Sequence, residues 1–125
     1  MRILLDTHTL IWWFEGSSRL LPSTVELIAD ARATVVVSVA TVWEIEIKRA
    51  LGTLTAPDDV LAQVAASGFD LLPINGEHAV AAARLPRHHD DPFDRLLIAQ
   101  AIAEGLTVVT RDHRFADYGV RLIPS

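Results

Sequence analysis

The segment 1–16 has the sequence MRILLDTHTLIWWFEG and contains the signals of one complete βα unit. The apolar run Ile3–Leu5 predicts a buried strand, and the stretch Thr7–Glu15 predicts a helix that ends at Gly16. Asp6 stands between them, where a strand ends and a helix begins. This unit is the first of several along the chain.

Short β-branched or apolar runs alternate with longer helical stretches over the whole sequence. The expected strands are residues 3–5, 34–37, 69–74, 106–110 and 120–123. The expected helices are residues 7–15, 22–32, 38–51, 57–68, 75–84 and 91–105, with a short helical turn after Asp112. Such alternation predicts an α/β fold with a central, mostly parallel, five-stranded sheet. No linker or repeat interrupts it, so we expect a single domain over residues 1–125.

The helix expected at residue 22 has two start signals. Pro22 suits a first helical turn, and Ser23 and Glu26 have the spacing of a capping box. We therefore expect Ser23 to cap this helix.

The composition excludes several classes of protein. The chain has 125 residues, half of them apolar, and no cysteine, which argues against disorder, a disulfide scaffold, a thiolate zinc site and a cysteine nucleophile. The apolar run Leu10–Phe14 is far shorter than the ~20 residues of a membrane span. Asp6 interrupts the apolar start of the chain, unlike in a signal peptide. We expect a cytoplasmic protein without a membrane partner.

The charge distribution constrains any binding to nucleic acid. The formal net charge of −5 falls within residues 1–83, whereas residues 84–125 are neutral overall. Phosphate binding usually requires a basic surface. A nucleic-acid substrate would therefore require cations that offset the acidic side chains.

Four acidic residues fall at or near the carboxyl ends of expected strands, where parallel sheets bind ligands. They are Asp6, Glu44, Asp94 and Asp112. Gathered carboxylates repel one another unless a positive charge lies between them, and hard divalent cations prefer oxygen ligands. The pattern favours a divalent metal site.

Three of these acids also have ordinary structural explanations. Asp6 and Asp112 are well placed to cap the helices that follow them. Asp94 lies in a first helical turn, where the helix dipole favours any acid. Asp91 fits the cap of that helix and has the spacing to pair with Arg95.

The choice of acid in the helix after the second strand stays open on spacing alone. Glu44 has the spacing to pair with Lys48 on the helix surface. Glu46 lies nearer than Glu44 to the apolar stripe of the same helix.

Four segments together resemble the acidic motifs of PIN domains, in order and in spacing. They are residues 3–7 (ILLDT), 38–48 (SVATVWEIEIK), 91–101 (DPFDRLLIAQA) and 106–115 (LTVVTRDHRF). The forms Trp-Glu-Ile and Asp-Pro-Phe-Asp-Arg are most similar to VapC-type toxins of type II toxin–antitoxin pairs. The resemblance covers essentially the whole chain and matches the family's second acid to Glu44.

The resemblance implies a three-layer α/β/α PIN-like fold and a metal-dependent endoribonuclease. Asp6, Asp94 and Asp112 would bind Mg²⁺ or Mn²⁺, and Glu44 would complete the catalytic acids. The residues expected to support these acids are Thr7, Ser38, Asp91 and Thr110.

The RNA substrate is expected to approach along the later half of the chain. Arg87, Arg95 and Arg111 are the main candidates for contacts with the RNA backbone, and His88, His89 and Arg114 lie in the same region. The polar loop 85–90 is expected to be mobile. His8 and His113 flank two of the acids and are expected to be surface or capping histidines.

Three tryptophans are candidate anchors for a partner protein, because large aromatic side chains dominate interfaces. They are Trp12, Trp13 and Trp43, and core packing is the alternative for at least one of them. The resemblance suggests a second copy of the chain, giving a homodimer, and a cognate antitoxin that covers the acidic pocket.

Other functions have weaker support. A haloacid-dehalogenase-like enzyme would require a second aspartate at His8, and a receiver domain would require one near Asn75. G-x-S-x-G, P-loop and G-x-G-x-x-G motifs are absent. The remaining alternative is a non-catalytic protein-binding module of the same fold, in which the acids only cap helices.

Overall fold

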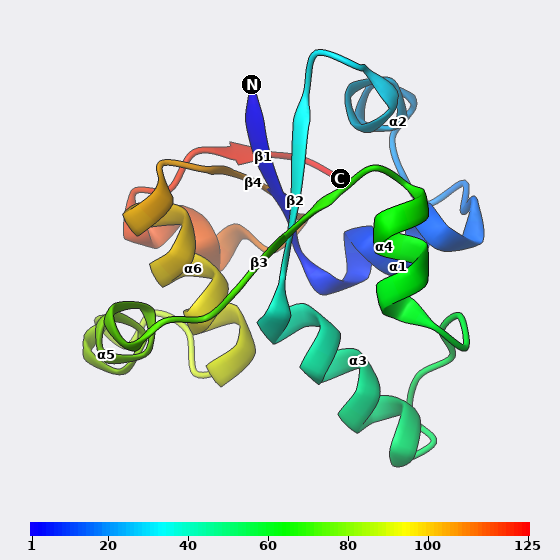
Figure 1. The fold of residues 1–125 in the computed structure, drawn as a ribbon. Coiled ribbons are helices and arrows are strands. Elements are labelled where there is room, and N and C mark those ends of the chain that lie inside the picture. The colour runs from blue at the N-terminus through cyan, green and yellow to red at the C-terminus, as the bar shows by residue number, and fades with distance from the viewer.

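A five-stranded parallel sheet forms the centre of the computed structural model, which describes residues 1–125 (Figure 1). Its strands are β1 (Arg2–Leu5), β2 (Thr34–Ser38), β3 (Asp70–Leu72), β4 (Thr107–Val109) and β5 (Leu122–Ile123). They lie in the order β3-β2-β1-β4-β5, and every neighbouring pair is parallel. The expectation of a five-stranded parallel sheet is confirmed.

Six α-helices and one 3-10 helix connect the strands. They are α1 (Thr7–Glu15), α2 (Pro22–Ala29), α3 (Val39–Ala50), α4 (Val60–Ala66), α5 (Gly76–Arg84), α6 (Pro92–Glu104) and the 3-10 helix η1 (His113–Tyr118). Figure 1 shows α1, α2 and α4 on one side of the sheet and α5 and α6 on the other. The three-layer arrangement follows from these positions. No helix combines the length and the apolar character that crossing a membrane requires.

Alternating strand side chains build a separate core on each face of the sheet. Ile3 and Leu5 of β1 pack with Leu10 of α1 in one buried cluster. Leu4, between them in the sequence, packs with Leu97 of α6 in the other cluster. Because successive strand residues point to opposite faces, a continuous apolar run fills both layers.

The helix α2 begins at residue 22, as expected, but its cap differs from the expectation. Its first residue is Pro22, and Leu21 occupies the cap position without a side-chain hydrogen bond. Ser23 therefore lies inside the helix, and the expected capping box is wrong. The helix also ends earlier, at Ala29, because the Asp30 side chain accepts a bond from the Arg32 backbone N–H at 2.9 Å and forms a turn there.

The sheet topology brings the predicted acids together. β1 and β4 are adjacent in the middle of the sheet, although about 100 residues separate them in the sequence. From β1 the chain adds β2 and β3 on one side, and it then adds β4 and β5 on the other side. Such a switch point between two neighbouring strands leaves a crevice beyond their carboxyl ends. Asp6 follows β1, Asp112 follows β4, and α3 packs against α6 at the same edge.

Candidate metal-binding active site

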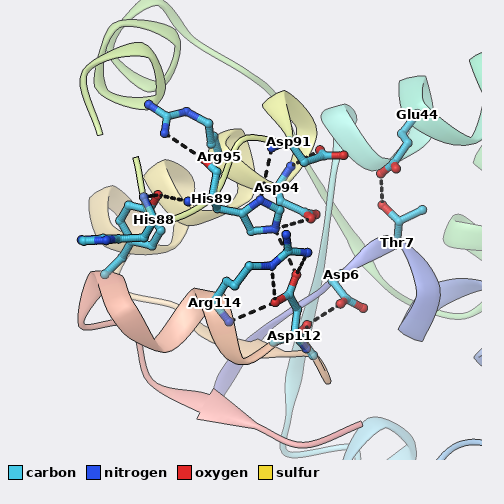
Figure 2. A network of polar contacts seen from close by, with 12 residues as sticks. Asp6, Thr7, Glu44, His88, His89, Asp91, Asp94, Arg95, Asp112 and Arg114 are labelled. Atoms are coloured by element: carbon cyan, nitrogen blue, oxygen red, sulfur yellow. Dashed lines mark hydrogen bonds and ion pairs between the residues drawn. The ribbon is translucent and has the colours of Figure 1, made fainter. Parts of the chain in front are cut away.

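A polar pocket of about 320 Å³ lies at this edge and has no hydrophobic residue in its lining. The lining residues are Asp6, Thr7, His8, Glu44, Lys48, His89, Asp91, Asp94, Asp112 and Arg114. All four predicted acids are among them, together with Asp91. Figure 2 shows the labelled side chains of this lining in one region, contributed by α1, α3, α6, η1 and the segments after β1, before α6 and after β4.

Asp6 both caps a helix and lines the pocket. Its Oδ1 accepts a hydrogen bond from the Thr9 backbone N–H at 2.9 Å, which caps α1. Its Oδ2 accepts a bond from the Thr110 hydroxyl at 2.5 Å. That hydroxyl oxygen accepts from the backbone N–H of Asp112 at 3.0 Å. Thr110 thus links Asp6 to Asp112. Asp6 caps α1 with one carboxylate oxygen and lines the pocket at the same time, so both explanations for this residue apply.

Glu44 is the acid of α3 that lies in the pocket. It is buried, and its carboxylate accepts bonds from the Thr7 hydroxyl at 2.5 Å and from Lys48 Nζ at 2.6 Å. Glu46 is half-exposed and pairs with Arg49 instead. The resemblance-based choice of Glu44 agrees with this geometry, and so does the expected pair with Lys48.

Asp94 has the most strongly shifted pKa among the residues of the pocket. Its backbone N–H donates to the Asp91 carboxylate, which caps α6 at 3.0 Å. Burial raises the pKa of the Asp94 carboxyl from 3.8 to about 7, and the neighbouring charges of Asp91, Glu44 and Asp6 add to this rise. A carboxylate with such a pKa lies where negative charge is already in excess.

Asp112 has the opposite environment. Arg114 donates to its two carboxylate oxygens at 3.0 and 2.8 Å, and the backbone N–H of Arg114 adds a third bond at 2.9 Å. These bonds hold the pKa of Asp112 at about 2. The pKa values of Asp112 and Asp94 are therefore shifted in opposite directions, although both carboxylates contact one histidine.

That histidine, His89, is the main residue of the site that sequence reasoning missed. It is buried, and its Nε2 lies 2.9 Å from Asp94 Oδ2 and 3.0 Å from Asp112 Oδ2. Its Nδ1 accepts from the backbone N–H of Asp91 at 3.2 Å, which leaves the ring proton on Nε2. The ring stands between the two carboxylates as a hydrogen-bond donor (Figure 2).

The donor set fits a divalent cation. Carboxylate oxygens of Asp94 and Asp112 lie within 4.8 Å of each other, with the donating Nε2 of His89 between them. The carboxylates of Asp6 and Glu44 line the same pocket. Carboxylate oxygens are the ligands that Mg²⁺ prefers, and the charges of neighbouring acids add to the rise that burial causes in the pKa of Asp94.

Three of the four residues expected to support the acids contact them. Thr7 bonds Glu44, Thr110 bonds Asp6, and Asp91 bonds the Asp94 backbone. Ser38 does not: its buried hydroxyl donates to Gln100 Oε1 at 2.5 Å and accepts from a backbone N–H at the start of α3. Ser38 is the helix cap, so its expected place beside the acids is wrong.

Arg95 has a structural position. Its guanidinium donates to backbone carbonyl oxygens and points away from the carboxylates (Figure 2). The acceptors are the carbonyl groups of Ala82, Ala83, Leu85, Pro86 and His89. The ion pair with Asp91 is not formed, and donors used in this way are not free for an RNA backbone. Both expectations for Arg95 are therefore corrected.

The loop 85–90 is held by hydrogen bonds to two side chains. Besides Arg95, Tyr118 holds it: the phenol oxygen accepts from the backbone N–H groups of His88 and His89 and donates to the Pro86 carbonyl at 2.6 Å. These contacts set the position of the His89 ring in the pocket. His89 is buried and is not the RNA contact that the sequence suggested, whereas Arg87 is exposed.

The three tryptophans have three different environments. Trp13 is partly buried against the core, with its ring 6.0 Å from that of Phe69, so core packing applies to it. Trp43 is 57% exposed. Trp12 lies beside the site and contacts His8, whose ring is 5.9 Å away.

Comparison with known proteins agrees with this fold. Residues 3–120 match the family model of the PIN domain. The chain belongs to the PIN domain family.

Within that family, the chain is similar to VapC proteins. It is 30% identical over 120 residues to ribonuclease VapC22 of Mycobacterium tuberculosis, covering 93% of this chain and 91% of the relative. The fold also matches VapBC of Salmonella typhimurium bound to DNA, with a TM-score of 0.71, 22% identity and coverage of 99% and 98%. VapBC2 of Rickettsia felis bound to a promoter DNA fragment matches with a TM-score of 0.70, 16% identity and the same coverage. The predicted resemblance to VapC-type proteins is confirmed.

Proposed function

We propose that this protein is a divalent-metal-dependent endoribonuclease that hydrolyses RNA phosphodiester bonds. The observation that carries the proposal is the convergence of Asp6, Glu44, Asp94 and Asp112 on one polar pocket, where burial and repulsion raise the pKa of Asp94 to about 7. The 30% identity to a VapC ribonuclease supports the same reaction.

Asp6, Asp94 and Asp112 would hold the ion, which we propose to be Mg²⁺ or Mn²⁺. When bound, such an ion supplies positive charge against the phosphate oxygens and makes water a stronger nucleophile near neutral pH. Asp94, relieved of its excess negative environment, then stays ionised. Glu44 is held by Thr7 and Lys48 and adds an acceptor for water on the opposite side of the pocket.

Neighbouring side chains keep the acids in place. His89 donates from Nε2 to Asp94 and Asp112 and so fixes the distance between their carboxylates. Thr110 fixes Asp6, and Arg114 fixes Asp112. Such supporting contacts typically matter about 10- to 100-fold for metal affinity or activity.

We further propose that the protein is the toxin of a type II toxin–antitoxin pair and forms a homodimer. The VapC relative and the VapBC complexes of the same fold support a cognate antitoxin as its partner. A basic antitoxin side chain entering the pocket would replace the missing cation. Trp43, being exposed, is the tryptophan best placed to contact a partner.

The test is cleavage of RNA by the purified protein with Mg²⁺, Mn²⁺ or a chelator. We expect cleavage only with metal, and its loss in Asp6→Asn and Asp94→Asn. Undiminished cleavage by both folded variants would remove the site. A thermal shift on adding metal separates the nuclease from a pure binding module, for which no shift is expected.

A further inference from the structure

A second cavity of about 330 Å³ adjoins the acidic pocket. Its lining residues are Asp6, His8, Trp12, Arg111, Asp112 and Ser125. Asp6, His8 and Asp112 line both cavities, so the two lie next to each other. A ligand bound in the acidic pocket therefore lies beside the second cavity.

Arg111 covers the Trp12 ring in this cavity. Its guanidinium carbon lies 4.5 Å from the ring centroid, and His8 contacts the same tryptophan one helical turn away. Arg111 forms no ion pair and donates no hydrogen bond, unlike Lys48 and Arg114, which pair with acids of the site. Arg111 is therefore next to Asp112 in the sequence but unpaired, and its guanidinium is held only by its contact with the Trp12 ring.

Other polar groups of the cavity also lack partners. The hydroxyl of Ser125 is buried without a hydrogen bond, although Ser125 lines the cavity. This buried hydroxyl is an unused hydrogen-bonding group of a residue in the cavity wall. The cavity thus offers stacking surfaces together with unused hydrogen-bonding groups.

We propose that this cavity binds one nucleobase of the RNA, from a nucleotide next to the scissile phosphate, with Trp12, Arg111 and His8 as the stacking surface. The inference rests on the proposed nuclease function, which places the phosphate in the acidic pocket. Proteins bind splayed-out RNA bases on aromatic rings and arginine planes, and the volume lies at the small end of ligand sites. The nearness of the acidic pocket favours RNA over an unrelated ligand.

The test uses an RNA oligonucleotide with one mapped cleavage site and matching oligonucleotides with a single abasic residue on either side of it. Trp12→Ala and Arg111→Ala are expected to lower kcat/KM roughly 10- to 100-fold on the intact RNA. On the abasic RNA that lacks the bound base, kcat/KM of the wild type is expected to fall by the same factor. The kcat/KM values of the two variants are expected to fall no further on this RNA. Trp12→Phe should keep most of the activity. Arg121→Ala removes one charge at the opposite edge of the sheet and should leave cleavage unchanged.

Separate readouts distinguish the failure of this inference from that of the nuclease proposal. An equal loss in Trp12→Ala on intact and abasic RNA, with an unchanged thermal shift on Mg²⁺ addition, would refute the base site and leave the nuclease standing. If the wild type cleaves no RNA, binding of the same oligonucleotides by fluorescence anisotropy decides: an effect of Trp12→Ala confined to intact RNA would support the base site. Loss of antitoxin binding alone would assign the cavity to the partner and overturn the inference.

Discussion

Replacing Asp94 by Asn should stabilise the metal-free protein while it abolishes cleavage. The pKa of Asp94 rises from 3.8 to about 7 because its side chain is only 23% exposed and faces other acids. At pH 8 the carboxylate is charged in both the folded and the unfolded chain. The difference between the two pKa values then corresponds to at most about 4 kcal/mol of destabilisation.

Asparagine removes the charge and keeps the shape. It can still accept a hydrogen bond from His89 Nε2, which lies 2.9 Å from Asp94 Oδ2, but it loses the charge-assisted part, about 1 kcal/mol. After allowance for screening, we expect the free energy of unfolding of Asp94→Asn to exceed that of the wild type by about 2 kcal/mol. For a domain of this size, this difference corresponds to a rise in Tm of about 8 °C. Since the folded state binds the extra proton between pH 4 and 7, metal-free wild-type stability falls as the pH rises through this window. The advantage of Asp94→Asn should therefore vanish near pH 4.

The assay is thermal unfolding with chelator and with Mg²⁺, at pH 4, 6 and 8. Mg²⁺ should raise the Tm of the wild type, more at pH 8 than at pH 6, and should raise that of Asp94→Asn much less. Asp117→Asn, which removes an exposed acid of η1 outside the pocket, serves as the matched control and should change little. A lower Tm for metal-free Asp94→Asn at pH 8 would refute the reasoning.

Three further substitutions test other parts of the site. Glu44→Gln should lower kcat at least 10-fold, whereas Glu46→Gln, on the exposed face of α3, should cleave RNA like the wild type; the reverse result in a cleavage assay would mean that the wrong acid has been assigned. His89→Gln should raise the Mg²⁺ concentration for half-maximal cleavage roughly 10- to 100-fold, because the ring positions two acids; an unchanged Mg²⁺ titration would contradict this role. Arg95→Lys should lower the free energy of unfolding by about 2–3 kcal/mol in urea, since one ammonium cannot satisfy five carbonyl groups, and an unchanged midpoint would count against it.

Local signals in the sequence predicted most of the elements. The helix α1 begins at Thr7 and ends before Gly16, as expected, because Asp6 caps its start and Gly16 adopts a left-handed conformation with φ of 60°. The same holds for α6, which begins after Asp91 and ends before Gly105. The cap of α2 was assigned wrongly because two competing signals, proline and a capping box, lie one residue apart.

The sequence by itself determined that Asp6 and Asp112 lie at one edge of the sheet, since the cap of a helix that follows a parallel strand lies there by construction. Glu44 and Asp94 are not caps, and they line the same pocket because α3 packs against α6. Only the tertiary structure decided which groups touch. The preference for Glu44 over Glu46 depends on Thr7 in a distant helix. The position of His89 between Asp94 and Asp112 depends on a loop held by Arg95 and Tyr118.

The charge state of Asp94 likewise depends on burial and on acids brought close by the crossover between β1 and β4. Spacing along the chain carries no information on these contacts, because each joins side chains whose separation is set by packing. Pattern in the sequence therefore fixes which residues reach the edge of the sheet, and packing fixes what each of them does there.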